Sequence, residues 1–372
     1  MYPAPFALER FFARHEFSAK YLLSSSDCEG FSQADLVAGA DLESRRMWDH
    51  LRLGYTESAG LPALRDEIAR TYGDVQPGQV FVAAPEECIF LAMNSLLEPG
   101  DHVVCTFPGY QSLYQLAFAL GCDVSFWKPV EADGWRFDPK DLAAVLRPHT
   151  KLIVWNFPHN PTGALPTQEE FEAILPVAEA SGATVFSDEM YRLLEPSPEL
   201  RLPAAVDRIP RAISFAGMSK SFGMAGLRIG WIATKDREVL DRVAALKDYT
   251  TICSSAPSEV LALMALRSSE RILEGHRGRL ACNLATAERF FAEHVRTFRW
   301  VPPQAGTVCF PRLLVEDGAE AFCERVLRDT GVLLLPSTVY GYGDSHIRLG
   351  LGRDDFEEGT SRLAEYLAGD RL

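Results

Sequence analysis

The sequence predicts an α/β protein with a mostly parallel sheet between helices and a second, smaller α+β domain. Strand-length apolar segments alternate with helix-length amphipathic stretches from about residue 60 to residue 235. Several of these segments carry β-branched apolar residues at successive positions, which is typical of strands covered on both faces. The hydrophobic content of 47% suffices for a packed core. The length of 372 residues exceeds the usual size of one domain.

Seven segments are predicted to form the strands of the sheet. They lie at residues 80–83, 102–106, 124–127, 151–156, 184–188, 212–215 and 229–233. The stretches between them carry helix signals. Thr167 and Glu170, for example, have the spacing of a capping box and precede an amphipathic apolar pattern. Strands that alternate with helices in this way are expected to run parallel.

The last third of the chain has a different pattern. The expected elements are a long helical stretch at about 257–297, a turn at Pro302 and Pro303, strands near 307–314 and 346–350, and helices near 319–330 and 355–368. We therefore expect three parts. They are an N-terminal segment (1–49) that joins the small domain, a large ligand-binding domain (50–260) and a C-terminal small domain (261–372).

The charge balance and the spacing of the cysteines argue against several classes of protein. The sequence has 37 basic and 51 acidic side chains, a formal net charge of −14 and no basic run, which argues against nucleic acid or an anionic membrane as a partner. No apolar stretch reaches the length that crosses a bilayer. The 8 cysteines are scattered without a CxxC pair, and no HExxH motif occurs. We therefore expect free thiols, no metal and a cytoplasmic location.

Polar residues stand where several of the predicted strands end. Asn160 follows the 151–156 strand, Asp188 closes the 184–188 strand, and Lys220 and Arg228 follow the 212–215 strand. Each has an ordinary interpretation alone, as a turn residue, a helix cap or a surface cation. Ligand sites of open parallel sheets lie beyond the carboxyl ends of the strands. The occurrence of these four residues together therefore predicts a ligand site at this edge of the sheet.

These residues belong to six motifs that occur in a fixed order along the chain. The motifs are Tyr55-x4-Gly60-x3-Leu64-Arg65, Phe107-Pro-Gly-Tyr110, His159-Asn160-Pro-Thr-Gly163, Ser187-Asp188-Glu-Met-Tyr191, Ser219-Lys220 with Gly226-Leu-Arg228-Ile-Gly230, and His346-Ile-Arg348-Leu. Together they resemble the class I/II aminotransferases, fold-type I enzymes that use pyridoxal 5′-phosphate (PLP). The resemblance covers nearly the whole chain. It implies a fold-type I PLP transferase of amino-acid metabolism, an amino acid and a 2-oxo acid as small-molecule partners, and a homodimer with shared active sites.

The resemblance also implies roles for the matched residues around the cofactor ring. Lys220 would form the Schiff base with PLP and then act as the proton-transfer base, which a lysine with a lowered pKa can do. Asp188 would pair with the pyridine nitrogen and keep it protonated. Asn160 and Tyr191 would hydrogen-bond the phenolic oxygen of the ring, Asn160 also bordering the substrate. Phe107 would stack on the ring face.

Other matched residues would hold the two ends of the ligands. Arg228 and Ser219 would bind the cofactor phosphate, and Tyr55 would reach the phosphate of the neighbouring subunit. Arg348 would clamp the substrate carboxylate through a bidentate pair. Tyr110 is expected to be a packing residue, and Arg65 to support a helix or the subunit interface.

The sequence departs from the family pattern at the phosphate. The family has small residues at a helix start whose backbone amides hold the phosphate, and this chain has Ala84-Pro85-Glu86-Glu87. Pro85 has no N–H to offer, and Glu86 would repel the phosphate. Gly217 also replaces the serine or threonine that the family has three residues before the lysine. We therefore expect weaker retention of the phosphate.

An acidic loop near the N-terminus suggests a preference among substrates. Asp27, Glu29 and Gly30 lie where related enzymes place a loop over the substrate. The two carboxylates would suit an amino or guanidino side chain, which predicts a basic or neutral amino acid rather than a dicarboxylic one. An exposed acidic loop without a substrate role is the alternative interpretation.

The reaction itself has several candidates, because fold-type I enzymes share their cofactor chemistry and differ in outcome. Transamination is the default. The stretches 156–161, 247–252 and 305–311 resemble the capreomycidine synthases, PLP enzymes that cyclise a hydroxylated arginine. Elimination on a sulfur-containing amino acid would use the same core residues. A non-catalytic domain that binds PLP or a metabolite is a further alternative, which the presence of Lys220 disfavours.

Overall fold

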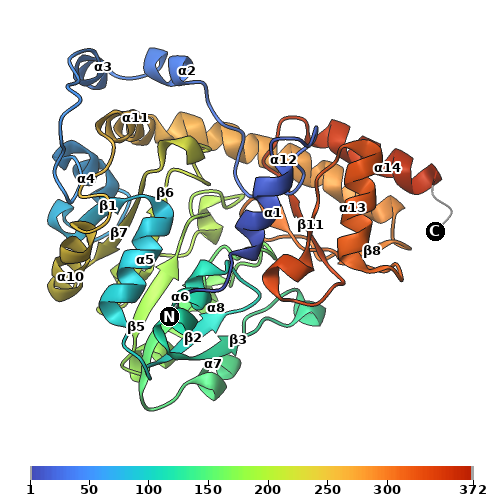
Figure 1. Cartoon of the computed structure of the whole chain (residues 1–372), viewed down its shortest axis with the longest axis horizontal. Helices are drawn as coiled ribbons and strands as arrows, with labels where there is room; N and C mark the ends of the chain where they lie inside the picture. Colours follow the sequence, from blue (N-terminus) through green and yellow to red (C-terminus); the bar gives the residue numbers. More distant parts are fainter. Residues whose placement is uncertain (1, 370–372) are drawn as a thin grey trace.

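A seven-stranded mixed sheet forms the centre of the computed structural model, which describes residues 2–369 (Figure 1). Its strands, in spatial order, are β1 (Val80–Ala83), β7 (Gly230–Thr234), β6 (Ala212–Gly217), β5 (Thr184–Asp188), β4 (Thr150–Asn156), β2 (His102–Thr106) and β3 (Asp123–Trp127). Strand β7 is antiparallel to both neighbours, and all other pairs are parallel. The predicted α/β class is confirmed, and all seven predicted strands are present with small shifts at some ends.

Helices cover both faces of this sheet. They are α4 (Pro62–Ala69), α5 (Pro85–Leu96), α6 (Ser112–Leu120), α7 (Pro139–Val145), α8 (Gln168–Ala180), α9 (Ala205–Arg208), α10 (Arg237–Lys247) and α11 (Ala256–Arg267). Leu152 and Val154 of β4 pack in an apolar cluster with α5, α6 and α10. Ile153 and Trp155 pack in a second cluster with α7 and α8. Side chains alternate along a strand, so these clusters lie on opposite faces.

The C-terminal part is a smaller group of helices and short strands. Its elements are α12 (Ser269–Glu293), β8 (Phe298–Arg299), β9 (Val308–Cys309), β10 (Arg312–Leu313), α13 (Gly318–Thr330), β11 (Leu335–Pro336), β12 (Ile347–Gly350) and α14 (Phe356–Gly369). Strand β12 pairs with β11 and β9, and β10 pairs with β8. Short 3₁₀ helices lie at Pro77–Gln79, Glu131–Asp133, Pro198–Leu200, Ala225–Leu227 and Ser337–Tyr340.

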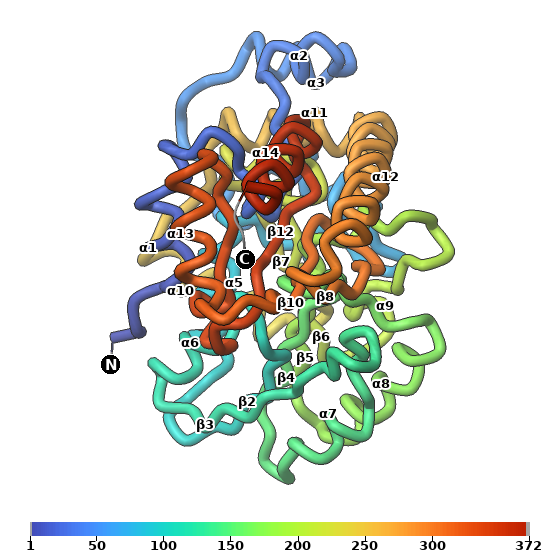
Figure 2. The backbone as a smooth tube through the Cα atoms, turned by 90° about the vertical axis from the view of Figure 1, so that its right-hand side faces the viewer, coloured from blue at the N-terminus to red at the C-terminus, as the bar shows by residue number. Residues whose placement is uncertain are grey.

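The first part of the N-terminal segment, with α1, lies against these C-terminal elements, whereas its last two helices lie against α11 (Figures 1 and 2). It contains α1 (Ala7–His15), α2 (Gln33–Ala38) and α3 (Leu42–Asp49). After α1, the Gly350 N–H donates to the Leu23 carbonyl at 2.7 Å, and the Glu29 N–H donates to the Gly352 carbonyl at 2.9 Å. A Cβ at Gly350 would lie only 1.7 Å from the Ser25 carbonyl oxygen. Glycine at this position therefore permits the close approach that brings residues 24–27 to the strand ends.

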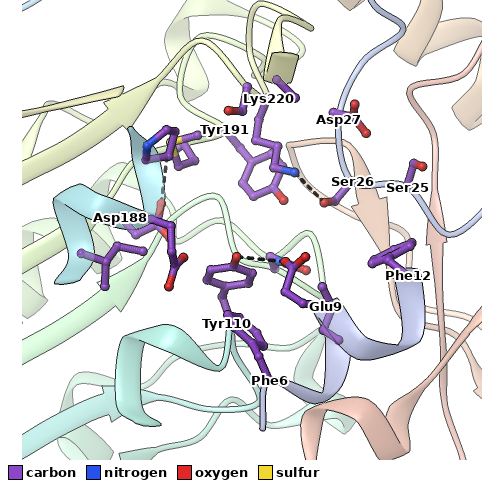
Figure 3. A pocket seen from close by; sticks show the side chains of 18 of the residues that line it. Phe6, Glu9, Phe12, Ser25, Ser26, Asp27, Tyr110, Asp188, Tyr191 and Lys220 are labelled. Atoms are coloured by element: carbon purple, nitrogen blue, oxygen red, sulfur yellow. Dashed lines mark hydrogen bonds between the residues drawn. The ribbon is translucent and has the colours of Figure 1, made fainter. Parts of the chain in front are cut away.

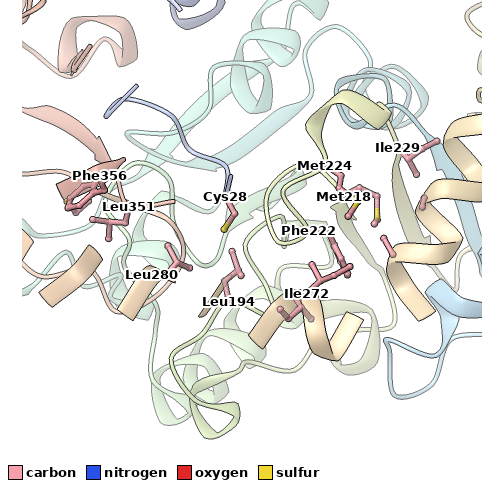
Figure 4. Packing of buried hydrophobic residues seen from close by; sticks show 14 of the residues in the cluster. Cys28, Leu194, Met218, Phe222, Met224, Ile229, Ile272, Leu280, Leu351 and Phe356 are labelled. Atoms are coloured by element: carbon pink, nitrogen blue, oxygen red, sulfur yellow. The ribbon is translucent and has the colours of Figure 1, made fainter. Parts of the chain in front are cut away.

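An apolar cluster fixes the loop that carries Lys220. Met218 and Phe222, on either side of the lysine, are buried in this cluster. Cys28 of the N-terminal segment and Leu351, after β12, belong to the same cluster (Figure 4). The lysine loop, the N-terminal segment and the C-terminal part are thus packed around one core.

Some elements differ from the expectations. The predicted helical stretch at about 257–297 is two helices, because Ser268 between α11 and α12 leaves the helical backbone at φ −106° and ψ 17°. The N-terminal helices α1, α2 and α3 and the short strands β8 and β11 were not expected. A two-residue strand is too short to show the alternation by which strands are recognised. The predicted capping box is present, since the Glu170 N–H donates to the Thr167 hydroxyl at 3.1 Å.

Across residues 2–369, no helix combines the length and apolar character of a membrane span. The same part of the chain has no cluster of three or more His, Cys, Asp or Glu side chains arranged to hold a metal ion. All 8 cysteines are free thiols.

Candidate active site

A cavity of about 560 Å³ lies at the carboxyl ends of the parallel strands (Figure 3). The residues that line it come from the N-terminal segment, the start of α5, the ends of the central strands and the loops after them, the turn before β7 and β12. The predicted site residues that line it are Asp27, Pro85, Glu86, Asn160, Asp188, Tyr191, Ser219, Lys220, Arg228 and Arg348. The fold thus brings together residues that lie far apart in the sequence.

Lys220 lines this cavity from the loop after β6. Its Nζ donates a hydrogen bond to Ser26 Oγ at 3.0 Å. Burial lowers the pKa of the amine, and Asp27 opposes this shift while Arg348 adds to it. An amine with a lowered pKa is neutral more often at physiological pH, so it can act as a nucleophile and as a base.

Asp188 stands at the end of β5 with only 5% of its surface exposed. The register pairs it with Asn156 of β4 and Phe215 of β6. Burial raises the pKa of its carboxyl to about 7, although the Met190 N–H donates to Oδ1 at 3.1 Å and lowers it. A buried carboxylate facing a cavity is stabilised by a positive partner there.

Arg348 of β12 is 1% exposed and is held by neutral oxygen atoms. Its Nη1 donates to the Tyr340 hydroxyl at 2.7 Å and to Asn160 Oδ1 at 3.2 Å. Its Nε and Nη2 both donate to the Ser24 carbonyl, at 3.2 Å and 2.6 Å. A buried guanidinium fixed in this way presents a positive charge to the cavity and suits a carboxylate ligand.

Tyr191 and Asn160 line the cavity between these charged groups. Tyr191 is buried, and its hydroxyl hydrogen-bonds Ser26, the residue that accepts from Lys220. Burial raises the pKa of the Tyr191 phenol. The Asn160 backbone N–H donates to Asn156 Oδ1 at 2.7 Å, which anchors its loop to the end of β4. Both side chains are therefore fixed hydrogen-bonding groups at the cavity wall.

Another region of the cavity wall combines a cation with a carboxyl group. Arg228 has a left-handed backbone with φ 56°, which is uncommon outside glycine. Its Nη1 donates to the Ala225 carbonyl at 3.2 Å. Ser219 lines the cavity as well, as do Pro85 and Glu86 from the first turn of α5. Burial raises the pKa of the Glu86 carboxyl, which accepts a hydrogen bond from the Ser112 hydroxyl.

The N-terminal segment adds a group of carboxylates that the sequence analysis did not identify in full. Glu9 and Glu16 line the cavity together with Asp27. Burial raises the pKa of Glu16, and the charges of Asp27 and Glu9 raise it further. Asp27 also pairs with Arg353, whose Nη2 lies 3.1 Å from its Oδ1. We call Glu9, Glu16 and Asp27 the acidic wall.

Tyr110, rather than Phe107, is the aromatic residue of their shared motif that lines the cavity. Phe107 is not among the lining residues, and its ring packs with its centroid 4.4 Å from that of Phe126. Tyr110, expected to be a packing residue, lines the cavity instead, and its hydroxyl donates to Glu9 at 3.3 Å (Figure 3).

Four other residues named in the motifs and the acidic loop lie outside the cavity wall. Gly30 is not among the lining residues, and Glu29 pairs with Arg353 at 3.3 Å. The side chain of Tyr55 is 89% exposed and does not reach the cavity of its own chain. Arg65 donates to the Gly60 carbonyl at 3.1 Å, which fits its expected supporting role.

Known proteins resemble this chain in sequence and in structure. The profile of the family described as aminotransferase class I and II matches residues 19–363. The capreomycidine synthase of Streptomyces vinaceus is 30% identical over 97% of this chain and 93% of that protein. A PLP-dependent aminotransferase of Streptococcus suis 89-1591 has a TM-score of 0.92 at 30% identity over 100% of both chains. The PLP-dependent cyclase OrfR has a TM-score of 0.89 at 28% identity over 99% of this chain and 98% of its own.

The match of the family profile extends from the N-terminal segment to α14, and the solved relatives share the fold over their whole length. The resemblance found in the six motifs is thereby confirmed. The chain belongs to the aminotransferase class I and II family and is a PLP-dependent transferase.

Proposed function

We propose that this enzyme moves the amino group of an α-amino acid to a 2-oxo acid, with Lys220 as the residue that binds the cofactor and transfers the proton. The observation that carries the proposal is the position of the Lys220 amine. It shares one cavity with the Asp188 carboxyl and the Arg348 guanidinium, and burial lowers its pKa. An amine, a carboxylate and a guanidinium in one cavity are the groups that this reaction needs.

The donors in the cavity fit PLP group by group. Lys220 offers an amine for its aldehyde, and Asp188 a buried carboxylate for its ring nitrogen. Asn160 and Tyr191 offer an amide and a hydroxyl for the ring oxygen. When bound, PLP supplies an electron sink for the bond broken at the substrate Cα. Tyr110 takes the place that we expected for Phe107 as the aromatic beside the ring.

The remaining roles concern orientation and proton transfer. Arg348 would hold the α-carboxylate of the substrate through a bidentate pair once its Nη1 bonds to Tyr340 and Asn160 give way to the ligand, while the Ser24 carbonyl keeps the guanidinium in place. This fixes the substrate Cα–H toward Lys220, whose neutral amine would accept the proton and return it. Ser26, which accepts from Lys220 and bonds Tyr191, would orient the amine.

We further propose that two copies form a homodimer. Arg228 and Ser219 would hold the phosphate in one subunit, and the exposed Tyr55 would reach it from the other. Leu53 and Tyr249 are also highly exposed apolar side chains, as expected of a surface that a second copy covers. We also propose that the chain divides into an N-terminal segment (1–49), a large domain (50–260) and a small domain (261–372), which supplies Arg348. The proposed location of the enzyme is the cytoplasm.

The acidic wall supports a basic or neutral amino acid as substrate in preference to a dicarboxylic one. Glu9, Glu16 and Asp27 face the same cavity as Arg348. A substrate held by its α-carboxylate at Arg348 would extend its side chain among these carboxylates, which attract a cation and repel a second carboxylate. Asp27 would contribute to this preference together with its partner Arg353, and Gly30 belongs to the same loop without lining the cavity.

A second reaction is favoured by particular relatives. The capreomycidine synthase and the cyclase OrfR both align with nearly the whole chain. Cyclisation of a basic, arginine-derived amino acid would use the same lysine and the same acidic wall. We rank it below amino-group transfer, because the family profile and the Streptococcus suis structure are those of aminotransferases.

One experiment separates these reactions. The purified enzyme with PLP is incubated with single amino acids, including arginine, and the products are identified by mass spectrometry with and without an added 2-oxo acid. If the enzyme transfers amino groups, it should release one equivalent of 2-oxo acid per active site when no acceptor is added. Continuous turnover should occur only when a 2-oxo acid acceptor is present. Continuous formation of a cyclic product or of ammonia without an acceptor would contradict it.

A further inference from the structure

We propose that Glu86 binds the cofactor phosphate as an uncharged acid, so that binding of PLP takes up a proton. The inference rests on the proposed position of the phosphate beside Arg228 and Ser219. It explains how a chain with a carboxyl group at this position can hold a doubly charged anion. It also predicts a pH dependence of cofactor binding that originates at the phosphate rather than at the ring.

Glu86 is placed where the phosphate is expected. It is the second residue of α5 and lines the cavity together with Pro85 and Ile89 of the same helix. A helix start normally offers free backbone N–H groups to an anion. Here Pro85 has none, and the Glu87 side chain accepts from the Ala84 N–H at 3.4 Å. The Glu86 and Glu87 N–H groups remain as backbone donors of this turn, and Glu86 supplies its polar side chain at the cavity.

Burial and the polar groups around Glu86 act in opposite directions on its pKa. The Ser112 hydroxyl donates to it and lowers its pKa, and the nearby Tyr110 hydroxyl lowers it as well. Arg228 also lowers it, whereas the negative charge of Glu9 raises it. Burial is the largest effect and leaves the pKa of Glu86 above its ordinary value.

The charge of Asp188, which also lines the cavity, further disfavours the ionised form of Glu86. Asp188 and Glu86 repel each other when both are ionised. Among the described residues, Glu86 forms no ion pair. Arg228, the cation that it faces, would be occupied by the phosphate when PLP is bound. Binding of the phosphate would thus neutralise the charge of Arg228, which favours ionisation of Glu86, and would add negative charge beside Glu86.

The sign of the pH dependence follows from these contacts. A neutral carboxylic acid donates one hydrogen bond to a phosphate oxygen, whereas a carboxylate repels it. The bound phosphate raises the pKa of Glu86 further, so the complex holds a proton that the free protein has partly released. Affinity for PLP then falls as pH rises between these two pKa values, by up to about tenfold per pH unit.

Binding of PLP to the cofactor-free protein tests the inference without any reaction. Affinity is measured by protein fluorescence between about pH 6 and about pH 9, and proton uptake by calorimetry in buffers of different ionisation enthalpy. Glu86→Gln keeps the shape and a hydrogen-bond donor without the charge. Glu87→Gln is the matched control, since Glu87 lies outside the cavity wall and accepts from Thr250 and Thr251. Pyridoxal, which lacks the phosphate, is the second ligand.

We expect wild type and Glu87→Gln to take up more protons on binding PLP than Glu86→Gln does. Titration of Asp188 and of the phosphate itself is common to all three and cancels in the comparison. At the alkaline end, Glu86→Gln should bind PLP about tenfold more tightly than wild type, whereas pyridoxal should show no such difference. Equal proton uptake and parallel pH profiles in wild type and Glu86→Gln would overturn the inference. Failure of PLP to bind through Lys220 at any pH would instead contradict the proposed function.

Discussion

The Lys220 Nζ donates to Ser26 Oγ at 3.0 Å, although the two residues are 194 positions apart in the sequence. This bond joins the loop after β6 to the N-terminal segment. The same segment supplies Ser24, whose carbonyl accepts from Arg348, and the acidic wall. The N-terminal segment is therefore part of the site, and substitutions there are expected to alter substrate selection more than cofactor binding.

Arg348→Lys tests the binding of the substrate carboxylate. Lysine keeps the charge but lacks the planar pair of donors. We expect kcat/KM to fall about one hundredfold for every amino acid substrate, which corresponds to about 2.7 kcal/mol, with PLP affinity unchanged. Steady-state kinetics and a PLP titration provide the two readouts. A normal KM in a folded Arg348→Lys protein would show that another residue binds the carboxylate.

Asp188→Asn tests the buried carboxyl through stability as a function of pH. The pKa of Asp188 in the folded protein is about 7, above the ordinary 3.8, so the folded state holds a proton that the unfolded state releases. Cofactor-free wild type should therefore lose stability relative to Asp188→Asn as pH rises from about 4 to about 7, by on the order of 2 to 4 kcal/mol. Urea unfolding at several pH values measures this difference. A difference that does not vary with pH would place the titration elsewhere.

The aromatic pair Tyr110 and Phe107 distinguishes ring contact from core packing. Tyr110→Leu should weaken PLP binding by up to about tenfold, the effect of losing one aromatic contact. Phe107→Leu should lower the melting temperature, because its ring packs on Phe126, and leave PLP affinity unchanged. If Phe107→Leu weakened PLP binding and Tyr110→Leu did not, Phe107 rather than Tyr110 would be the residue in contact with the cofactor ring.

Glu16→Gln tests the acidic wall as a determinant of substrate side chain. We expect kcat/KM for arginine to fall about tenfold relative to glutamine, since an ion pair in the cavity is lost. In wild type this preference should weaken as pH falls through the raised pKa of Glu16, because the carboxylate then becomes neutral. Glu29→Gln is the control, as Glu29 lies outside the cavity wall. A preference for aspartate that Glu16→Gln leaves unchanged would contradict the assignment.

The sequence predicted the parts of this molecule that depend on local pattern. Each strand of the sheet has its own apolar run, and Asn160, Asp188 and Lys220 follow strands whose ends the register brings together. Because these strands are parallel, the topology of the sheet places the three residues at the same edge.

The positions that could not be predicted depend on contacts between distant segments. Glu9 and Glu16 reach the cavity only because α1 lies over the strand ends, and nothing in their own sequence signals this. Tyr110 rather than Phe107 lines the cavity, and the Phe107 ring instead packs on Phe126 of β3. A ring contact with the next strand has no signature in the motif.

The central claim is that the Lys220 amine binds PLP and transfers the proton in amino-group transfer. The direct measurement is a single-turnover reaction of the PLP-loaded enzyme with an amino acid, followed by the absorbance of the bound cofactor and by the 2-oxo acid released. We predict one equivalent of 2-oxo acid with a matching spectral change in wild type, and neither within the same time in Lys220→Ala. An unchanged rate in Lys220→Ala, or a spectral change in wild type without a 2-oxo acid, would contradict the account.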